Sequence, residues 1–117
     1  MNKISASKIK NLIVETLKEN QAIEINPINV SKLTDLTNYL VICTANSTAH
    51  ANALTGKCCT TLLGLGVKPI GVEGQDHKEW ILVDFVEVIL HIMLEPVRDF
   101  YKLDNLWYNP KTIKQLI

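Results

Sequence analysis

The chain has 117 residues, of which 47% are hydrophobic and 21% are charged, a length and composition that suit one domain with a packed core. Its 12 basic and 12 acidic residues cancel to a formal net charge of zero, whereas proteins that hold nucleic acid by its phosphates are generally basic, so no direct nucleic-acid recognition is predicted. No apolar run reaches the roughly eighteen residues of a membrane span and no signal peptide opens the chain, so we expect a cytoplasmic protein without a membrane partner.

Apolar periodicity divides the first part of the chain into helices and strands. It predicts a helix over 7–20 capped by Ser5 or Ser7, strands over 23–30 and 39–45, a helix from about 48 to 65 capped by Asn46 or Ser47, and a short strand over 68–72. Pro27 cannot donate a backbone hydrogen bond, so the first strand is expected at a sheet edge. The helix between the second and third strands is a crossover, which predicts that these strands form a parallel pair.

Two apolar runs, 80–85 and 88–94, are separated only by Val86 and Glu87, which predicts a β-hairpin. Facing Phe85 with Val88 sets the register of the hairpin and assigns each side chain to a face. One face is wholly apolar and should pack on helices: Ile81, Val83, Phe85, Val88, Leu90 and Ile92. The other is mixed: Trp80, Leu82, Asp84, Ile89, His91 and Met93. This mixed face is either a surface that receives a partner or a second core layer under another helix.

A last helix opens at Glu95 and Pro96, and its apolar residues continue to Trp107 before Pro110 breaks the pattern. The order helix-strand-strand-helix-strand-strand-strand-helix predicts an α/β fold. We expect a single domain with a mixed, mostly five-stranded sheet and flanking helices.

Charge is unevenly distributed. Between Glu73 and Glu87 there are five acidic residues against one basic residue, Lys78. An apolar centre with a rim of one sign describes a docking surface for a basic partner. A solvated acidic loop remains the simpler alternative.

Signals for chemistry are weak, and neither a catalytic nor a metal site is predicted. The turn between the second strand and the second helix, 44–47, lacks the glycine of a phosphate-gripping turn, and no close pair of carboxylates follows to hold Mg²⁺. The histidines and the three cysteines lack zinc-ligand spacing, and the cysteines are expected to be reduced thiols. His91 beside Asp84 is interpreted as a structural hydrogen-bonded pair.

Several ordered segments resemble the ribosomal silencing factor family, also called Iojap-like. They are Tyr39-Leu-Val-Ile-Cys-Thr-Ala-Asn-Ser, His50, Gly71-Val-Glu-Gly, Trp80, Asp84, His91 and Arg98-x-x-Tyr101-x-Leu103-x-x-Leu106-Trp107. The match covers roughly 5–108 as a silencing-factor-like domain and leaves 109–117 as a short C-terminal tail. Asn38 stands where the family pattern has an acidic residue, and Val86-Glu87 stand where it has Gly-Asp.

The resemblance implies a nucleotidyltransferase-like topology without the catalytic motif, and a binding protein with no cofactor. It implies docking on the large ribosomal subunit through its fourteenth protein, which blocks joining with the small subunit and represses translation when nutrients are scarce. A homodimer that hides the same patch is a further expectation. The residues expected to bind the partner are Trp80, Leu82 and Met93 as anchors, Glu73, Asp76 and Asp84 as acidic contacts, His91 placing Asp84 or joining the patch, and Arg98, Tyr101 and Trp107 at its flank. The alternatives are a nucleotide-binding or nucleotidyltransferase-like enzyme and a dimeric adaptor for another basic protein.

Overall fold

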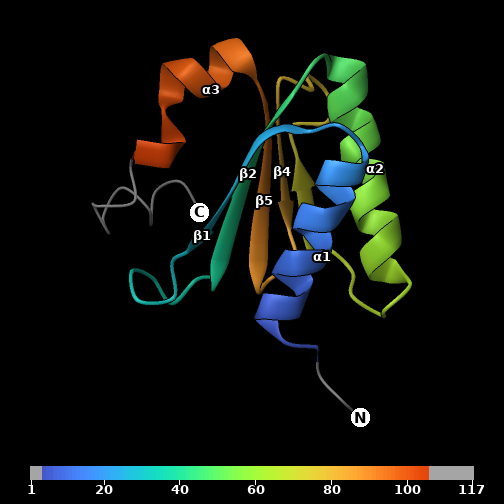
Figure 1. The fold of residues 1–117 in the computed structure, drawn as a ribbon, viewed down its shortest axis with the longest axis vertical. Coiled ribbons are helices and arrows are strands. Elements are labelled where there is room, and N and C mark those ends of the chain that lie inside the picture. The colour runs from blue at the N-terminus through green and yellow to red at the C-terminus, as the bar shows by residue number, and fades with distance from the viewer. Residues whose placement is uncertain (1–3, 106–117) are drawn as a thin grey trace.

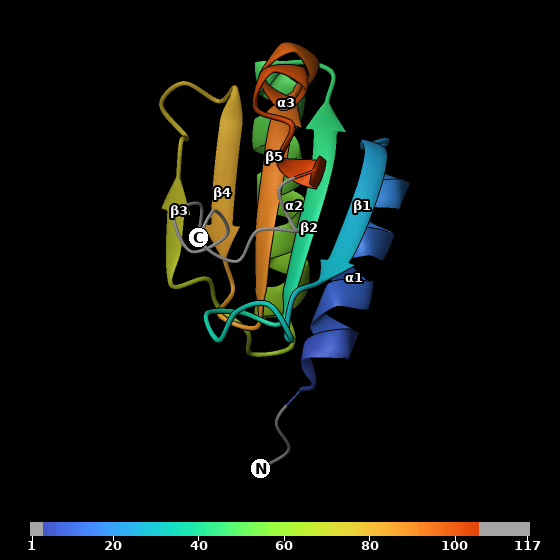
Figure 2. The same cartoon turned by 90° about the vertical axis from the view of Figure 1, so that its left-hand side faces the viewer.

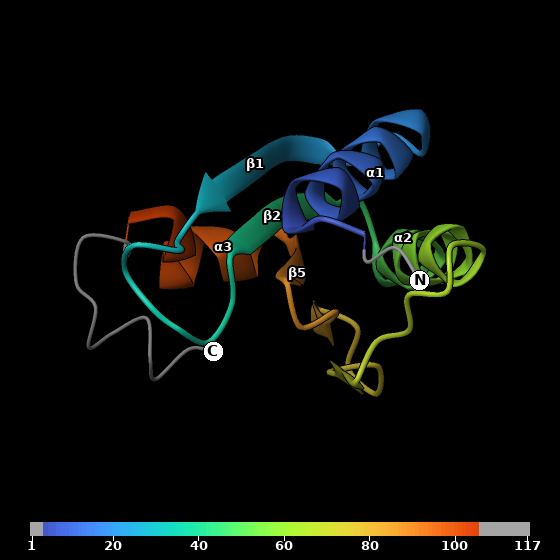
Figure 3. The same cartoon turned by 90° about the horizontal axis from the view of Figure 1, so that it is seen from below.

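In the computed structural model, which describes residues 4–105, a mixed five-stranded sheet separates two layers of helix (Figures 1 and 2). The elements in chain order are α1 (Ala6–Glu19), β1 (Ile23–Asn29), β2 (Tyr39–Ala45), α2 (Thr48–Leu63), β3 (Gly71–Glu73), β4 (Trp80–Asp84), β5 (Val88–Leu94), α3 (Glu95–Tyr101) and the 3₁₀ turn η1 (Leu103–Asn105). Seen along the strands, α1 and α2 lie on one side of the sheet and α3 on the other (Figure 3). The predicted α/β class and sheet are confirmed. No helix within residues 4–105 is long and apolar enough to cross a bilayer.

The ends of both long helices follow local chemistry. Ser5 Oγ accepts a hydrogen bond from the Lys8 amide at 3.1 Å, and Ser47 Oγ accepts one from the His50 amide at 3.0 Å, so serine caps begin α1 and α2 as predicted. The second helix ends at Leu63, two residues early. The chain reverses there at Gly66, whose φ of +79° is a conformation that glycine adopts readily.

The strand order is β1-β2-β5-β4-β3, with β1 at an edge as expected from Pro27. The predicted parallel pairing of β2 with the strand after α2 was wrong. The two strands run in the same direction, but β5 and β4 lie between them, and the parallel partner of β2 is β5. Length and periodicity predict a crossover helix, but they do not show how many strands lie between the two strands that the helix connects. Strand β3 is also shorter than predicted, since it begins at Gly71 after Pro69, which has no amide hydrogen.

The hairpin of β4 and β5 has the predicted register. Trp80 pairs with Met93 and Leu82 with His91, and the apolar face packs with α1 and α2 in the main core. Val86 in the turn has φ +73°, a strained value for a β-branched residue.

The opposite face of the sheet holds a second, smaller core. It contains Val30, Leu40, Ile42, Ile89, Met93 and Leu103, with Trp80, Leu82 and Val97 packed partly buried against it. Leu103 comes from η1 and Val30 directly follows β1, so chain segments cover this face over β2 and β5. The interpretation as a second core is therefore confirmed over the middle strands, whereas the side chains over β4 are only partly buried.

Candidate protein-binding site

Aromatic side chains gather where the start of β4 meets the end of α3. The rings of Trp80 and Tyr101 have centroids 4.9 Å apart, and the Phe100 ring meets Tyr101 edge-on at 5.0 Å. Phe100 is 79% exposed and Tyr101 is 48% exposed, while Trp80 and Leu82 are half-buried. We call Trp80, Leu82, Phe100 and Tyr101 the aromatic patch. Such an exposed group of large apolar side chains is typical of a protein-binding surface.

Carboxylates border the aromatic patch on the side of β3. Glu73 pairs with Leu82 across the β3–β4 ladder, so both side chains lie on the same face of the sheet. Asp76 and Glu79 are exposed in the loop between these strands, and Asp84 is half-buried at the end of β4. These four residues, Glu73, Asp76, Glu79 and Asp84, form the acidic rim.

Asp84 does not pair with His91, contrary to the expectation. Its Oδ1 accepts a hydrogen bond from the Val86 amide at 2.8 Å and so supports the hairpin turn. His91 is buried, and its Nδ1 instead accepts a hydrogen bond from Trp80 Nε1 at 3.0 Å. Burial lowers the pKa of His91 to about 4, so the ring is neutral at neutral pH.

Met93 and His91 were expected in the partner-binding surface, but the structure buries both side chains within the second face of the sheet. Met93 is covered because Leu103 and Val30, which are distant in sequence, lie over the middle strands. Neither side chain is accessible to a partner in this structure.

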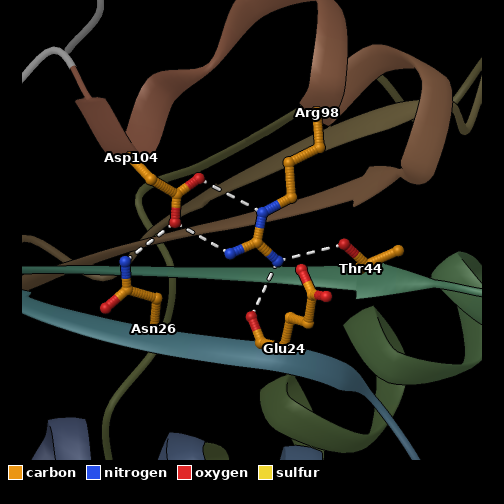
Figure 4. Close-up of polar contacts among 5 residues, drawn as sticks. All are labelled: Glu24, Asn26, Thr44, Arg98 and Asp104. Atoms are coloured by element: carbon orange, nitrogen blue, oxygen red, sulfur yellow. Dashed lines mark hydrogen bonds and ion pairs between the residues drawn. The ribbon is translucent and has the colours of Figure 1, made fainter.

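Arg98 was also expected to flank the surface, but its guanidinium faces inward (Figure 4). Its Nε and Nη2 donate to the Asp104 carboxylate at 3.2 and 2.8 Å, and Nη1 donates to the Glu24 carbonyl at 2.7 Å and to Thr44 Oγ1 at 3.0 Å. The side chain is only 11% exposed. Glu24 has φ +47° at an irregularity in the β1–β2 pairing. Arg98 therefore fastens α3 to β1, β2 and η1, and it is a structural clamp.

The acid of this clamp is held ionised. Burial alone would raise the pKa of Asp104, but hydrogen bonds from Arg98 and Asn26 outweigh burial and hold it below its usual value. A polar cleft of about 380 Å³ lies beside the pair, and Glu95, Asp99 and Lys102 contribute to its lining. Most guanidinium donors there are already engaged. Within residues 4–105, no three His, Cys, Asp or Glu side chains are grouped to hold a metal ion.

Comparison with known families matches residues 3–116 to the family described as ribosomal silencing factor during starvation. The chain belongs to the ribosomal silencing factor family. A Chromobacterium violaceum protein named ribosomal silencing factor RsfS is 35% identical over 104 residues, covering 89% of this chain and 85% of that one. A crystal structure of a protein from the same organism superposes with a TM-score of 0.86 at 34% identity, covering 89% of this chain and 87% of that one.

A mouse relative in the same comparison is named mitochondrial assembly of ribosomal large subunit protein 1. It is 30% identical over 99 residues, which cover 82% of this chain and 43% of the mouse protein.

The two departures from the silencing-factor pattern contact each other. The Asn38 side-chain amide donates a hydrogen bond to the Glu87 carboxylate, and the Glu87 carbonyl accepts from the amides of Asn38 and Tyr39 at 3.2 Å. An acidic residue at 38 would place a second negative charge against Glu87. The side-chain amide of Asn38 carries no charge, so it donates to the Glu87 carboxylate without that repulsion.

For this family member, sequence reasoning placed Trp80, Leu82, Tyr101 and the acids together but missed Phe100. Trp107 lies outside the described residues. The signal for Phe100 was available, because adjacent residues of a helix point in directions about 100° apart, so Phe100 and Tyr101 cannot both turn toward the sheet. One of them had to face solvent.

Proposed function

We propose that this protein binds the large ribosomal subunit through its fourteenth protein and thereby blocks joining with the small subunit, repressing translation when nutrients are scarce. It acts by binding, without catalysis. Membership of the ribosomal silencing factor family and the name of the mouse relative support the ribosomal partner.

The observation that carries the proposal is the aromatic patch beside the acidic rim. A half-buried Trp80 supplies a fixed apolar anchor, and exposed Tyr101 and Phe100 extend it along α3. The acidic rim complements the basic surface expected of a ribosomal protein. An interface on the order of 800 Å² per partner is enough for specific binding, with most of the affinity in a few central side chains.

Binding alone is then sufficient for silencing, because each large subunit that carries the protein is prevented from joining. The domain extends 42 × 32 × 22 Å, so a copy docked on the subunit-joining surface would sterically obstruct the approach of the small subunit. Its effect should follow the fraction of large subunits that carry it.

The test is cosedimentation of the purified protein with separated large subunits, separated small subunits and joined ribosomes. We expect it to pellet with large subunits alone and to prevent rejoining. Trp80→Ala should weaken binding at least tenfold while remaining folded, because buried aromatic anchors contribute most to such interfaces. Leu63→Ala is the matched control, since it truncates an exposed apolar residue of α2 on the other side of the sheet. Wild-type protein that binds none of the three particles at low salt would refute the proposal.

We also propose that free copies form a homodimer through the aromatic patch, so that dimerisation and subunit binding compete. Sedimentation of Trp80→Ala should then show a weaker dimer as well. A nucleotide-binding role would instead raise the melting temperature in the presence of nucleotides and Mg²⁺. An adaptor for another basic protein would form a dimer but would bind none of the ribosomal particles.

A further inference from the structure

We propose that His91 is a positioning residue: from inside the sheet it fixes the orientation in which Trp80 meets the partner. This inference rests on the proposed docking function, and it assigns to His91 a role through Trp80 in place of a direct contact. Across the β4–β5 ladder Trp80 pairs with Met93 and Leu82 pairs with His91, so Trp80 and His91 are diagonal neighbours on one face of the sheet.

The hydrogen bond between them restricts the indole strongly. An indole has a single donor, and here Nε1 is 3.0 Å from His91 Nδ1. The two rings are tilted by 43° with centroids 5.9 Å apart, and Tyr101 contacts the indole at 4.9 Å. One bond at the nitrogen and one ring contact together leave the indole little freedom to rotate. The exposed part of Trp80 therefore presents an aromatic surface in one fixed orientation. Its Nε1–H group is bonded to His91 and is not available to a partner.

The position of His91 is otherwise one for an apolar residue. It lies in the central strand β5, where its neighbours Leu90, Ile92 and Met93 are fully buried hydrophobic side chains. Accepting from Trp80 at Nδ1 requires the proton on Nε2, and buried Nε2 has no hydrogen-bond partner among residues 4–105. A buried polar group of this kind is costly to the fold. A leucine at this position would pack without an unsatisfied polar group, so stability alone does not account for the histidine.

Two substitutions separate positioning from packing. His91→Leu fills a similar volume without an acceptor, whereas His91→Asn keeps an oxygen near the position of Nδ1 but leaves a cavity. We expect the leucine variant to be at least as stable as wild type yet to bind large subunits about fivefold to tenfold more weakly, the range of one hydrogen bond. We expect the asparagine variant to be less stable yet to bind within about twofold of wild type. In a Trp80→Phe background, which has no indole N–H, His91→Leu should change the affinity no further.

The inference would be overturned if the affinity for large subunits rose and fell with stability across the variants, so that His91→Leu bound as well as wild type. An equal loss on adding His91→Leu in the Trp80→Phe background would overturn it as well. Long-range proton–nitrogen NMR of wild-type protein provides a readout that needs no variant to fold. It should show His91 protonated on Nε2 and the Trp80 indole proton protected from exchange, and a proton on Nδ1 would exclude the bond. Failure of wild-type protein to bind any subunit would overturn the proposed function and the docking role of His91 together. Loss of binding in Trp80→Ala but not in His91→Leu would overturn only the role of His91.

Discussion

Arg98 links segments that are distant in the chain, and we expect its loss to be costly. Arg98→Met would remove the guanidinium donors to the Asp104 carboxylate, the Glu24 carbonyl and Thr44 Oγ1, although Asp104 would keep its hydrogen bond from Asn26. The free energy of unfolding should fall by about 2–4 kcal/mol, because breaking a mostly buried pair strands its partner. Urea denaturation measures this change.

The matched control for that substitution is Lys57→Met, which removes an exposed cation from α2. It should change stability by less than about 0.5 kcal/mol. Equal midpoints for the Arg98 variant and wild type would show that the guanidinium contacts contribute nothing to the fold.

Because His91 is buried, we expect the free energy of unfolding to depend on pH between the unfolded and folded pKa values of this residue. Burial lowers its pKa from about 6.5 in the unfolded chain to about 4 in the fold, so between these values the unfolded chain binds more protons. Stability should therefore fall as the pH drops from 6.5 to 4, by up to about 3 kcal/mol, and this contribution should level off below pH 4. Asp104, whose pKa is also lowered, adds a loss at still lower pH. The free energy of unfolding of His91→Leu should change less with pH over the same range. Parallel profiles for this variant and wild type would show that His91 does not cause the pH dependence.

At the scale of whole elements, the connection from β3 to β4 depends on Gly74. Its φ is +89°, and a Cβ built there would lie 2.0 Å from the Trp80 carbonyl oxygen, a contact that only backbone movement can relieve. Gly74→Ala should cost more than about 2 kcal/mol and displace the start of β4, weakening subunit binding through Trp80. Circular dichroism melts and cosedimentation measure the two effects.

Gly56 supplies the matched control, because it lies within α2 with open space around its Cα. Gly56→Ala should stabilise the protein by about 0.5–1 kcal/mol and leave binding unchanged, since alanine favours a helix over glycine. If both alanine variants destabilised the protein equally, the explanation from the contact with Trp80 would be wrong.

The elements were predictable where one local pattern determined them. Alternation of apolar residues specified the hairpin register, and polar residues marked the helix starts to within two residues, where the structure selects Ser5 over Ser7 and Ser47 over Asn46. Strand neighbours were not predictable in this way, because the pairing of β2 with β5 joins residues distant in the sequence. The site divided along the same line. Trp80 and Leu82 followed from the faces of the strands, but the burial of Met93 depends on Leu103, and the inward turn of Arg98 depends on residues of β1 and β2.

For the whole molecule, the arrangement of charge should matter more than its sum. The net charge is zero, so we expect any attraction to the proposed ribosomal partner to come from a local group of like charges such as the acidic rim. Combining Glu73→Gln with Asp76→Asn should weaken binding at low salt by about twofold to tenfold and make it less sensitive to added salt. Glu15→Gln with Glu19→Gln, on α1 across the sheet, removes the same charge and should leave both quantities unchanged. Equal effects of the two pairs would argue against a local electrostatic contact.

The strand order also bears on how the molecule is made. The middle strand, β5, is the last strand within residues 4–105, and the Arg98–Asp104 clamp follows it. During synthesis, β1 and β2 leave the ribosome first as a hairpin that lacks the neighbour on its inner edge, and the main core cannot close until Leu94 has emerged. Pairing over such a separation is slow, because the loop must close before the contacts form. A nascent chain of this family member therefore completes its fold, and with it the surface proposed to act on ribosomes, only after β5 and α3 have both been synthesised.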